Sequence, residues 1–132
     1  MIAPAAYLDA SAFVKTVVDE PESDALDRYL REWPRRTSSA LLRTEARRAV
    51  RHVDPPAMER AITALSGVEL VDVRSDILES AGMLDPVVLR SLDAIHLATA
   101  QALGGDVGVV VTYDSRMREG SERLGLRVEA PA

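Results

Sequence analysis

The stretch Val107-Gly108-Val109-Val110-Val111-Thr112 decides the fold, because apolar residues fill nearly all of it. A strand that covers one face of a core alternates apolar and polar residues, whereas a near-continuous valine run is typical of a strand buried on both faces. Sheets buried on both faces are usually parallel and carry helices on each side. The stretch therefore predicts an α/β fold with residues 107–112 as a buried strand.

Strands and helices alternate along the rest of the chain, which favours a mostly parallel central sheet with helices on both faces. The expected strands are 6–10, 37–39, 68–73, 107–112 and 127–129. The expected helices are 11–18 with Ser11 as N-cap, 22–33, 40–53 with Ser39 as N-cap, 55–65, 75–83, 92–103 with Ser91 as N-cap, and 115–124. No internal repeat or linker is visible, so residues 1–132 are expected to form a single domain.

Composition excludes several classes of protein. The chain is 47% hydrophobic, which supports a real core, and its lack of cysteine excludes disulfides and thiolate metal sites. No apolar run reaches the ~20 residues of a membrane span, and the N-terminus lacks the basic region of a signal peptide. We expect a soluble cytoplasmic protein.

Four carboxylates stand inside or beside apolar runs: Asp9, Glu45, Asp93 and Asp114. In open parallel sheets the ligand crevice lies outside the carboxyl ends of the strands, where Asp9 and Asp114 are expected. Asp93 falls in the first turn of its helix, and Glu45 lies among the apolar residues of its own. Acids in such places are usually paired or bound to a metal. The four predict one electronegative cavity for Mg²⁺ or Mn²⁺.

Helix geometry places Glu45 on the apolar side of its helix, where an acid most needs a partner or a ligand. At 100° per residue it lies within one apolar arc of its helix. The members of that arc are Leu41, Leu42, Ala46, Ala49, Val50 and Val53.

A separate stripe at i, i+4 spacing consists of Arg43, Arg47 and Arg51. Between Arg28 and Arg51 there are eight arginines and two acids, so this part is basic although the whole chain carries a net charge of −5. Such a stripe suits RNA phosphates or an acidic partner.

Each acid also has a purely structural interpretation. Asp9 and Asp114 could cap helices, and Asp93 could simply favour its helix dipole. Glu45 could pair with Arg48 at i+3. One metal site explains all four at once, with Ser11 and Thr112 as hydroxyls that hold the carboxylates. His96, one turn beyond Asp93, is interpreted as a hydrogen-bonded core histidine.

Four motifs resemble those of the PIN-domain family, and within it the VapC-type toxins of bacterial toxin–antitoxin pairs. They are Tyr7-Leu8-Asp9-Ala10-Ser11-Ala12, Ser39-Ala40-Leu41-Leu42-Arg43-Thr44-Glu45, Leu92-Asp93-Ala94-Ile95-His96-Leu97-Ala98 and Val111-Thr112-Tyr113-Asp114. The resemblance implies a PIN-like three-layer fold and an Mg²⁺- or Mn²⁺-dependent endoribonuclease that cleaves structured RNA such as tRNA or rRNA. It also implies a homodimer and inhibition by a small cognate antitoxin.

The resemblance assigns catalytic roles to Asp9, Glu45, Asp93 and Asp114, with Asp9, Asp93 and Asp114 as metal ligands. It leaves Arg43, Arg47 and Arg51 to bind RNA or the antitoxin. Many relatives carry another acid two or three residues after the last motif, but here the next is Glu119, so we expect one metal. Two alternatives remain, a PIN-like module that binds without cleaving and a phosphoaspartate-type phosphatase or receiver.

Overall fold

The computed structural model describes residues 2–85 and 89–132, and their strands form one parallel sheet in the order β3-β2-β1-β4-β5. The strands are β1 (Ala5–Leu8), β2 (Arg36–Ser39), β3 (Glu69–Val71), β4 (Val107–Val111) and β5 (Val128–Glu129). The helices are α1 (Ala10–Val17), α2 (Ser23–Leu30), α3 (Leu42–Val50), α4 (Pro55–Leu65), α5 (Ser75–Gly82), α6 (Ser91–Leu103) and α7 (Ser115–Arg123), with a 3₁₀ turn at Gly104–Asp106.

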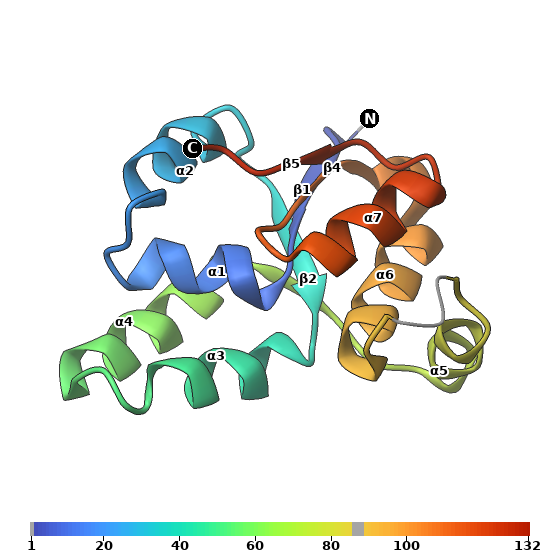
Figure 1. Cartoon of the computed structure of the whole chain (residues 1–132). Coiled ribbons are helices and arrows are strands. Elements are labelled where there is room, and N and C mark those ends of the chain that lie inside the picture. Colours follow the sequence, from blue (N-terminus) through green and yellow to red (C-terminus); the bar gives the residue numbers. More distant parts are fainter. Residues whose placement is uncertain (1, 86–88) are drawn as a thin grey trace.

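Helices cover both faces of the sheet, which confirms the predicted fold class (Figure 1). In that view α1, α2, α3 and α4 lie to the left of the strands, and α5, α6 and α7 lie to the right. Side chains of β1 and β4 alternate between the two sides. Tyr7 and Val110 pack with α5, α6 and α7, whereas Leu8, Val109 and Val111 pack with α1 and α2. The valine run is buried on both faces, as its sequence predicts.

Gly108 interrupts that run for a packing reason. A Cβ atom at this position would lie 2.5 Å from Cζ3 of Trp33, so even alanine would force the indole to move. Trp33 itself packs against the core formed by β1, β4, α1 and α2. The absence of a side chain at Gly108 therefore leaves room for the indole of Trp33 to pack against the central strands.

The ends of several elements differ from the predictions, mostly at caps. The N-cap of α1 is Asp9, whose side chain accepts a hydrogen bond from the Ala12 amide, so the assignment to Ser11 was wrong. The N-cap positions of α3 and α6 are Leu41 and Arg90, rather than Ser39 and Ser91. Neither makes a side-chain cap hydrogen bond. These differences move each start by one or two residues and keep every predicted element.

The buried strip of α3 is narrower than the predicted apolar arc. Its buried residues are Leu42, Ala46 and Val50. Ala49 is exposed, and Val53 is 46% exposed because the helix ends at Val50. Glu45 therefore lies at the margin of the buried strip, with 18% of its side chain exposed.

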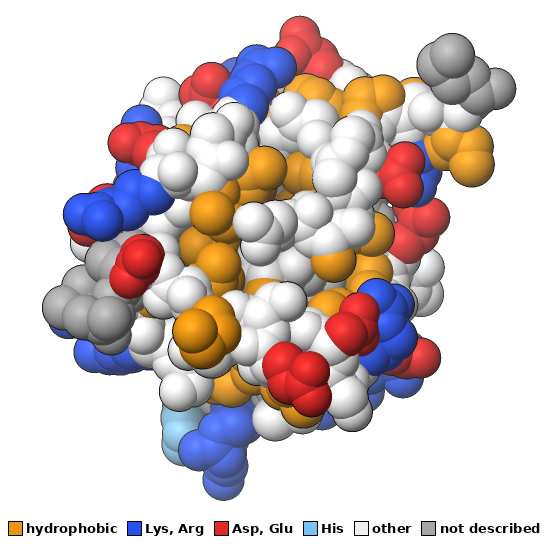
Figure 2. Space-filling view, turned by 90° about the vertical axis from the view of Figure 1, so that its right-hand side faces the viewer, with side chains coloured by type: hydrophobic (Ala, Val, Ile, Leu, Met, Phe, Trp, Pro, Cys, Tyr) orange, Lys and Arg blue, Asp and Glu red, His pale blue; other side chains and the backbone are white. Residues whose placement is uncertain are grey.

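Apolar side chains also reach the surface over α5 and α6. Leu78 and Leu92 are each 48% exposed and Met83 is 85% exposed. A hollow of about 340 Å³ lies beside them, lined by residues that include Leu84, Leu89 and Ile95. Figure 2 shows this side of the molecule, with hydrophobic side chains across its centre and many charged ones around its margin.

No helix of the described residues is long and apolar enough to cross a membrane.

Candidate active site

The four predicted acids come together at the carboxyl edge of the sheet. Asp9 directly follows β1, and Asp114 follows the neighbouring strand β4 as the N-cap of α7. Glu45 and Asp93 stand in the first turns of α3 and α6. Burial and the negative charges of Asp114, Asp9 and Glu45 raise the pKa of Asp93. The charges of the other three acids therefore act on Asp93.

Asp9 is the most tightly held member of the set. It is 4% exposed, and its Oδ1 accepts hydrogen bonds from the Ala12 amide at 3.0 Å and the Ser11 hydroxyl at 2.7 Å. Its Oδ2 accepts a hydrogen bond from the Thr112 hydroxyl at 2.5 Å. Burial raises the pKa of Asp9, although these donors and the nearby His96 act in the opposite direction. The sequence-based interpretation of Asp9 as a helix cap is therefore correct, and it leaves open a second role for the same carboxylate.

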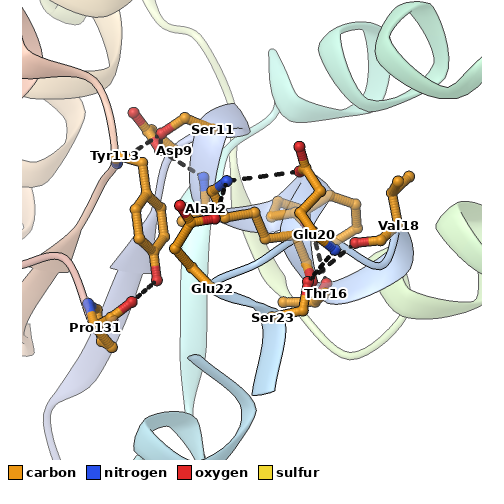
Figure 3. A network of polar contacts seen from close by, with 12 residues as sticks. Asp9, Ser11, Ala12, Thr16, Val18, Glu20, Glu22, Ser23, Tyr113 and Pro131 are labelled. Atoms are coloured by element: carbon orange, nitrogen blue, oxygen red, sulfur yellow. Dashed lines mark hydrogen bonds and ion pairs between the residues drawn. The ribbon is translucent and has the colours of Figure 1, made fainter. Parts of the chain in front are cut away.

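Ser11 and Thr112 tie Asp9 to the loop that carries Asp114. The Ser11 oxygen accepts a hydrogen bond from the Tyr113 amide at 2.9 Å, and the Thr112 oxygen accepts one from the Asp114 amide at 3.1 Å. Figure 3 shows Asp9 and Ser11 beside Tyr113, whose hydroxyl donates a hydrogen bond to the Pro131 carbonyl. The two hydroxyls thus fix the separation between the ends of β1 and β4.

Asp114 caps α7 with only one of its oxygens. Its Oδ1 accepts hydrogen bonds from the amides of Arg116 and Met117, both at 2.9 Å. The second oxygen takes no part in the cap and can face a ligand. Capping and ligand binding are therefore compatible at this residue.

Asp93 differs from its neighbours because its carboxylate accepts no hydrogen bond from the described part of the chain. It is neither fully buried nor fully exposed. The helix dipole favours an acid in this first turn, but burial and three nearby acids still raise the pKa of Asp93 overall. A cation would stabilise an acid that its neighbours repel and that has no donor among residues 2–85 and 89–132.

Glu45 is held by His96, a contact that sequence reasoning missed. The Nε2 atom of His96 lies 2.6 Å from Oε1 of Glu45, and its Nδ1 lies 2.8 Å from the Tyr7 hydroxyl. His96 is only 1% exposed, so its interpretation as a hydrogen-bonded core histidine is confirmed. The proposed Glu45–Arg48 pair is absent from the described ion pairs. A buried histidine one helical turn from Asp93 was the only signal in the sequence that could have suggested this partner.

The four carboxylates are chemically suitable ligands for a hard divalent cation, but their spacing in the described structure does not form a metal site. All four groups are carboxylates, the ligands that Mg²⁺ and Mn²⁺ prefer, and their mutual repulsion is what such an ion would relieve. Within residues 2–85 and 89–132, however, no three carboxylate or imidazole groups are close enough to hold one ion together. The four carboxylates therefore form an acidic site rather than a preformed metal cluster, and water molecules could complete the coordination of an ion there.

The predicted arginine stripe does not belong to this acidic site. Arg43, Arg47 and Arg51 are exposed, and helix geometry places them on the side of α3 opposite Glu45. Arg43 and Arg47 line a separate hollow of about 230 Å³ with Leu65 and Leu70. Arg48 is also exposed and lies on the same side of α3 as Glu45.

Two more arginines of the basic segment have structural partners. Arg35 forms an ion pair with Glu69 at 3.0 Å. Arg36 donates hydrogen bonds to the carbonyls of Leu30 and Trp33. The basic character of residues 28–51 is therefore divided among several surfaces.

Comparison with known proteins assigns the chain to a family. The sequence profile of the PIN domain matches residues 6–122. The chain is 52% identical over 128 residues to Ribonuclease VapC46 of Mycobacterium tuberculosis, covering 97% of this chain and 98% of the relative. It is 41% identical over 129 residues to Ribonuclease VapC35 of the same species, covering 95% and 96%.

Solved structures share the fold at low sequence identity. Mycobacterium tuberculosis VapC20, described as a sarcin–ricin loop cleaving toxin, superposes with a TM-score of 0.75 at 17% identity, covering 96% of this chain and 100% of that one. A chain of a toxin–antitoxin complex from Klebsiella pneumoniae superposes with a TM-score of 0.74 at 22% identity, covering 97% and 98%. Sequence and fold agree: the chain belongs to the PIN-domain family, in its VapC group.

Proposed function

We propose that this protein is a toxin endoribonuclease that hydrolyses RNA phosphodiester bonds with the help of Mg²⁺ or Mn²⁺. One observation carries the proposal: Asp93 has no hydrogen-bond donor in the described chain, and burial together with the charges of Asp114, Asp9 and Glu45 raises its pKa. A fold gains no stability from such an arrangement, so a ligand of opposite charge is its simplest explanation. The ribonuclease names of the relatives from Mycobacterium tuberculosis support the same reaction.

The proposed roles follow from how each carboxylate is held. Asp9, Asp93 and Asp114 are the proposed ligands of a single ion, directly or through water. Glu45, with Oε1 bound to His96, is proposed to orient or deprotonate the attacking water through its other oxygen. A bound divalent ion supplies an activated water and stabilises the charge that develops on the phosphate. Ser11 and Thr112 keep Asp9 and the Asp114 loop in place.

The proposed substrate is a structured RNA such as tRNA or rRNA. Sequence-specific proteins usually read the single-stranded loops of such molecules, whose bases are accessible. VapC20 is described as cleaving the sarcin–ricin loop, which supports this class of substrate. The exposed arginines of α3 are proposed to contact phosphates that flank the scissile bond, or the antitoxin.

Replacement of Arg43, Arg47 and Arg51 by alanine tests the stripe. We expect weaker binding of RNA or antitoxin, with little change in kcat, because these side chains point away from Glu45. If all three contact single-stranded RNA, the slope of log affinity against log salt should fall by about 2. Arg48→Ala, on the side of Glu45, is the comparison. Native affinity of the triple variant for both partners would reduce the stripe to an ordinary solvent-exposed face.

An antitoxin and a second copy of the chain are the proposed protein partners. The Klebsiella pneumoniae neighbour is a toxin–antitoxin complex, which supports the first. The apolar surface on this side of the molecule (Figure 2) supports the second, since exposed apolar patches commonly mark protein interfaces. Leu78 and Leu92 are among the exposed apolar residues of α5 and α6. The mass of the protein in solution would test for a homodimer. We propose a cytoplasmic location, which cell fractionation would check.

Two other functions are less well supported. A phosphoaspartate-type phosphatase is expected to carry a second acid two residues after the first, but Ser11 stands at that position after Asp9. Lys15, the only lysine, pairs instead with Glu22 at 2.8 Å. A PIN-like module that binds RNA without cleaving it would be expected to lack a ligand, and all four acids are present.

Incubation with total RNA separates these possibilities. The purified wild-type protein should cut RNA at discrete positions in millimolar Mg²⁺ or Mn²⁺, and chelation should stop the reaction. Re-addition of the ion should restore it. RNA that is bound but remains intact in both ions would favour the non-cleaving module.

A further inference from the structure

A series of hydrogen-bonded side chains runs from the core of the sheet to the acidic site. It consists of Tyr7 on β1, His96 on α6 and Glu45 on α3, joined at 2.8 Å and 2.6 Å. Tyr7 and His96 are 0% and 1% exposed, whereas the Glu45 side chain is 18% exposed. The chain thus ends on a carboxylate that meets solvent at the site.

The hydrogen-bond partners of the two ring nitrogens of His96 indicate which nitrogen carries the proton. A tyrosine hydroxyl is protonated near neutral pH, so that of Tyr7 can donate a hydrogen bond to Nδ1 of His96, 2.8 Å away. Nδ1 of His96 then accepts from Tyr7, and Nε2 holds the ring proton. The carboxylate of Glu45 offers only acceptors, which matches an N–H on Nε2. Each link in the chain then has one donor and one acceptor.

We infer that His96 is a positioning residue for the reaction, acting through Glu45. The side chain of glutamate has three rotatable bonds, and the charges of Glu45 and Asp93 repel each other. The bond from Nε2 of His96 fixes Oε1 of Glu45 against that repulsion and does not engage Oε2. Tyr7 in turn keeps His96 in the tautomer that donates to Glu45. This inference rests on the proposed function, because it assumes that Glu45 takes part in cleavage.

Two substitutions of similar polarity separate positioning from packing. His96→Asn keeps polar atoms near the place of Nδ1 but cannot reach Glu45. His96→Gln places an N–H near the original Nε2. Both disturb the same buried position, so a packing role predicts similar losses for the two.

We expect His96→Asn to lower kcat about 10–100-fold with KM for RNA unchanged, as loss of a supporting hydrogen bond typically does. His96→Gln should recover much of that loss. Ser121→Ala is the matched control, because it deletes a buried hydroxyl that bonds the Met117 carbonyl within α7. Equal loss of kcat in the Asn and Gln variants, at equal folded fractions, would overturn the positioning role.

A double-variant comparison tests whether His96 acts through Glu45. His96→Asn in a Glu45→Ala background should cause no further loss of cleavage, because the residue it positions is gone. An additional loss equal to that in the wild-type background would show that His96 acts independently of Glu45. If Glu45→Ala alone cleaves normally, the proposed role of Glu45 fails, which is a different result from failure of His96.

Nitrogen-15 NMR of the His96 ring gives a test that requires no activity. The wild-type spectrum should show a proton on Nε2 and an unprotonated Nδ1 that accepts a hydrogen bond. Tyr7→Phe should alter the Nδ1 signal while leaving the ring buried. A proton on Nδ1 alone would contradict the inference, because His96 could not then donate to Glu45.

Discussion

Asp93→Asn is expected to lower kcat/KM for RNA by about 10²–10³-fold in saturating Mg²⁺. Asparagine keeps the shape of the side chain but removes the charge, and with it a ligand of the proposed ion. A ligand-held ion contributes several kcal/mol of transition-state stabilisation, and a loss of about 3–4 kcal/mol corresponds to this change in rate. The measurement is initial cleavage of a defined RNA by equal amounts of folded protein.

Asp24→Asn provides a matched control for that experiment. Asp24 is also an acid in the first turn of a helix, α2, but it is exposed and lies outside the acidic cavity. Its substitution should leave cleavage unchanged. If Asp93→Asn cleaves as fast as Asp24→Asn, then Asp93 serves only the dipole of α6 and the proposed metal site loses its central ligand. In cells, the inactive variant should also relieve growth arrest.

The elements of this fold were predictable because their signals are local. The valine run, the apolar spacing of the helices and the Pro55-Pro56 start of α4 each act within a few residues of the chain. Caps were less predictable, because Asp9 and Ser11 are both good capping residues and lie two positions apart. Only the end of β1 at Leu8 decides between them, and that end depends on pairing with β4.

The candidate site divides in the same way. The four acids could be selected from the sequence, because each is a charge beside an apolar run. The partner of Glu45 could not, since His96 lies 51 residues away and its ring is placed by the packing of α6 on the sheet. Periodicity also predicted the arginine stripe as a continuous face of α3. It could not predict that this face would point toward α4 and β3, since that depends on tertiary packing.

The stability of the metal-free protein gives the last prediction, in which two acids of the same site should behave oppositely. Asp93→Asn should leave the Tm unchanged or raise it, because it removes a repelled charge that no described donor stabilises. Asp9→Ala should lower stability by at least about 1 kcal/mol, since it deletes the N-cap of α1. It also leaves the Ser11 and Thr112 hydroxyls without their acceptor.

The pH dependence follows from the raised pKa of Asp93. A carboxyl whose pKa is higher in the folded state than its ordinary value of 3.8 destabilises the fold once it ionises. This cost is absent below about pH 3.8, grows as the pH rises through the raised pKa, and is complete above it. The stability advantage of Asp93→Asn over wild type should therefore increase from acidic to neutral pH. An advantage that shrinks over this interval would mean that the folded state stabilises the Asp93 charge.

Magnesium should reverse the order of wild type and Asp93→Asn. An ion that binds only the folded protein adds RT ln(1 + [L]/Kd), about 2.7 kcal/mol at a hundred times Kd. Wild type should gain that stability in millimolar Mg²⁺, and Asp93→Asn should gain much less because a ligand is missing. Thermal melts of both proteins in chelator and in Mg²⁺ measure all four values. Two results together would contradict the metal site: Asp93→Asn is less stable than wild type in chelator, and the Tm of wild type does not change in Mg²⁺. Asp93 would then be a structural acid, and the four carboxylates would hold no metal.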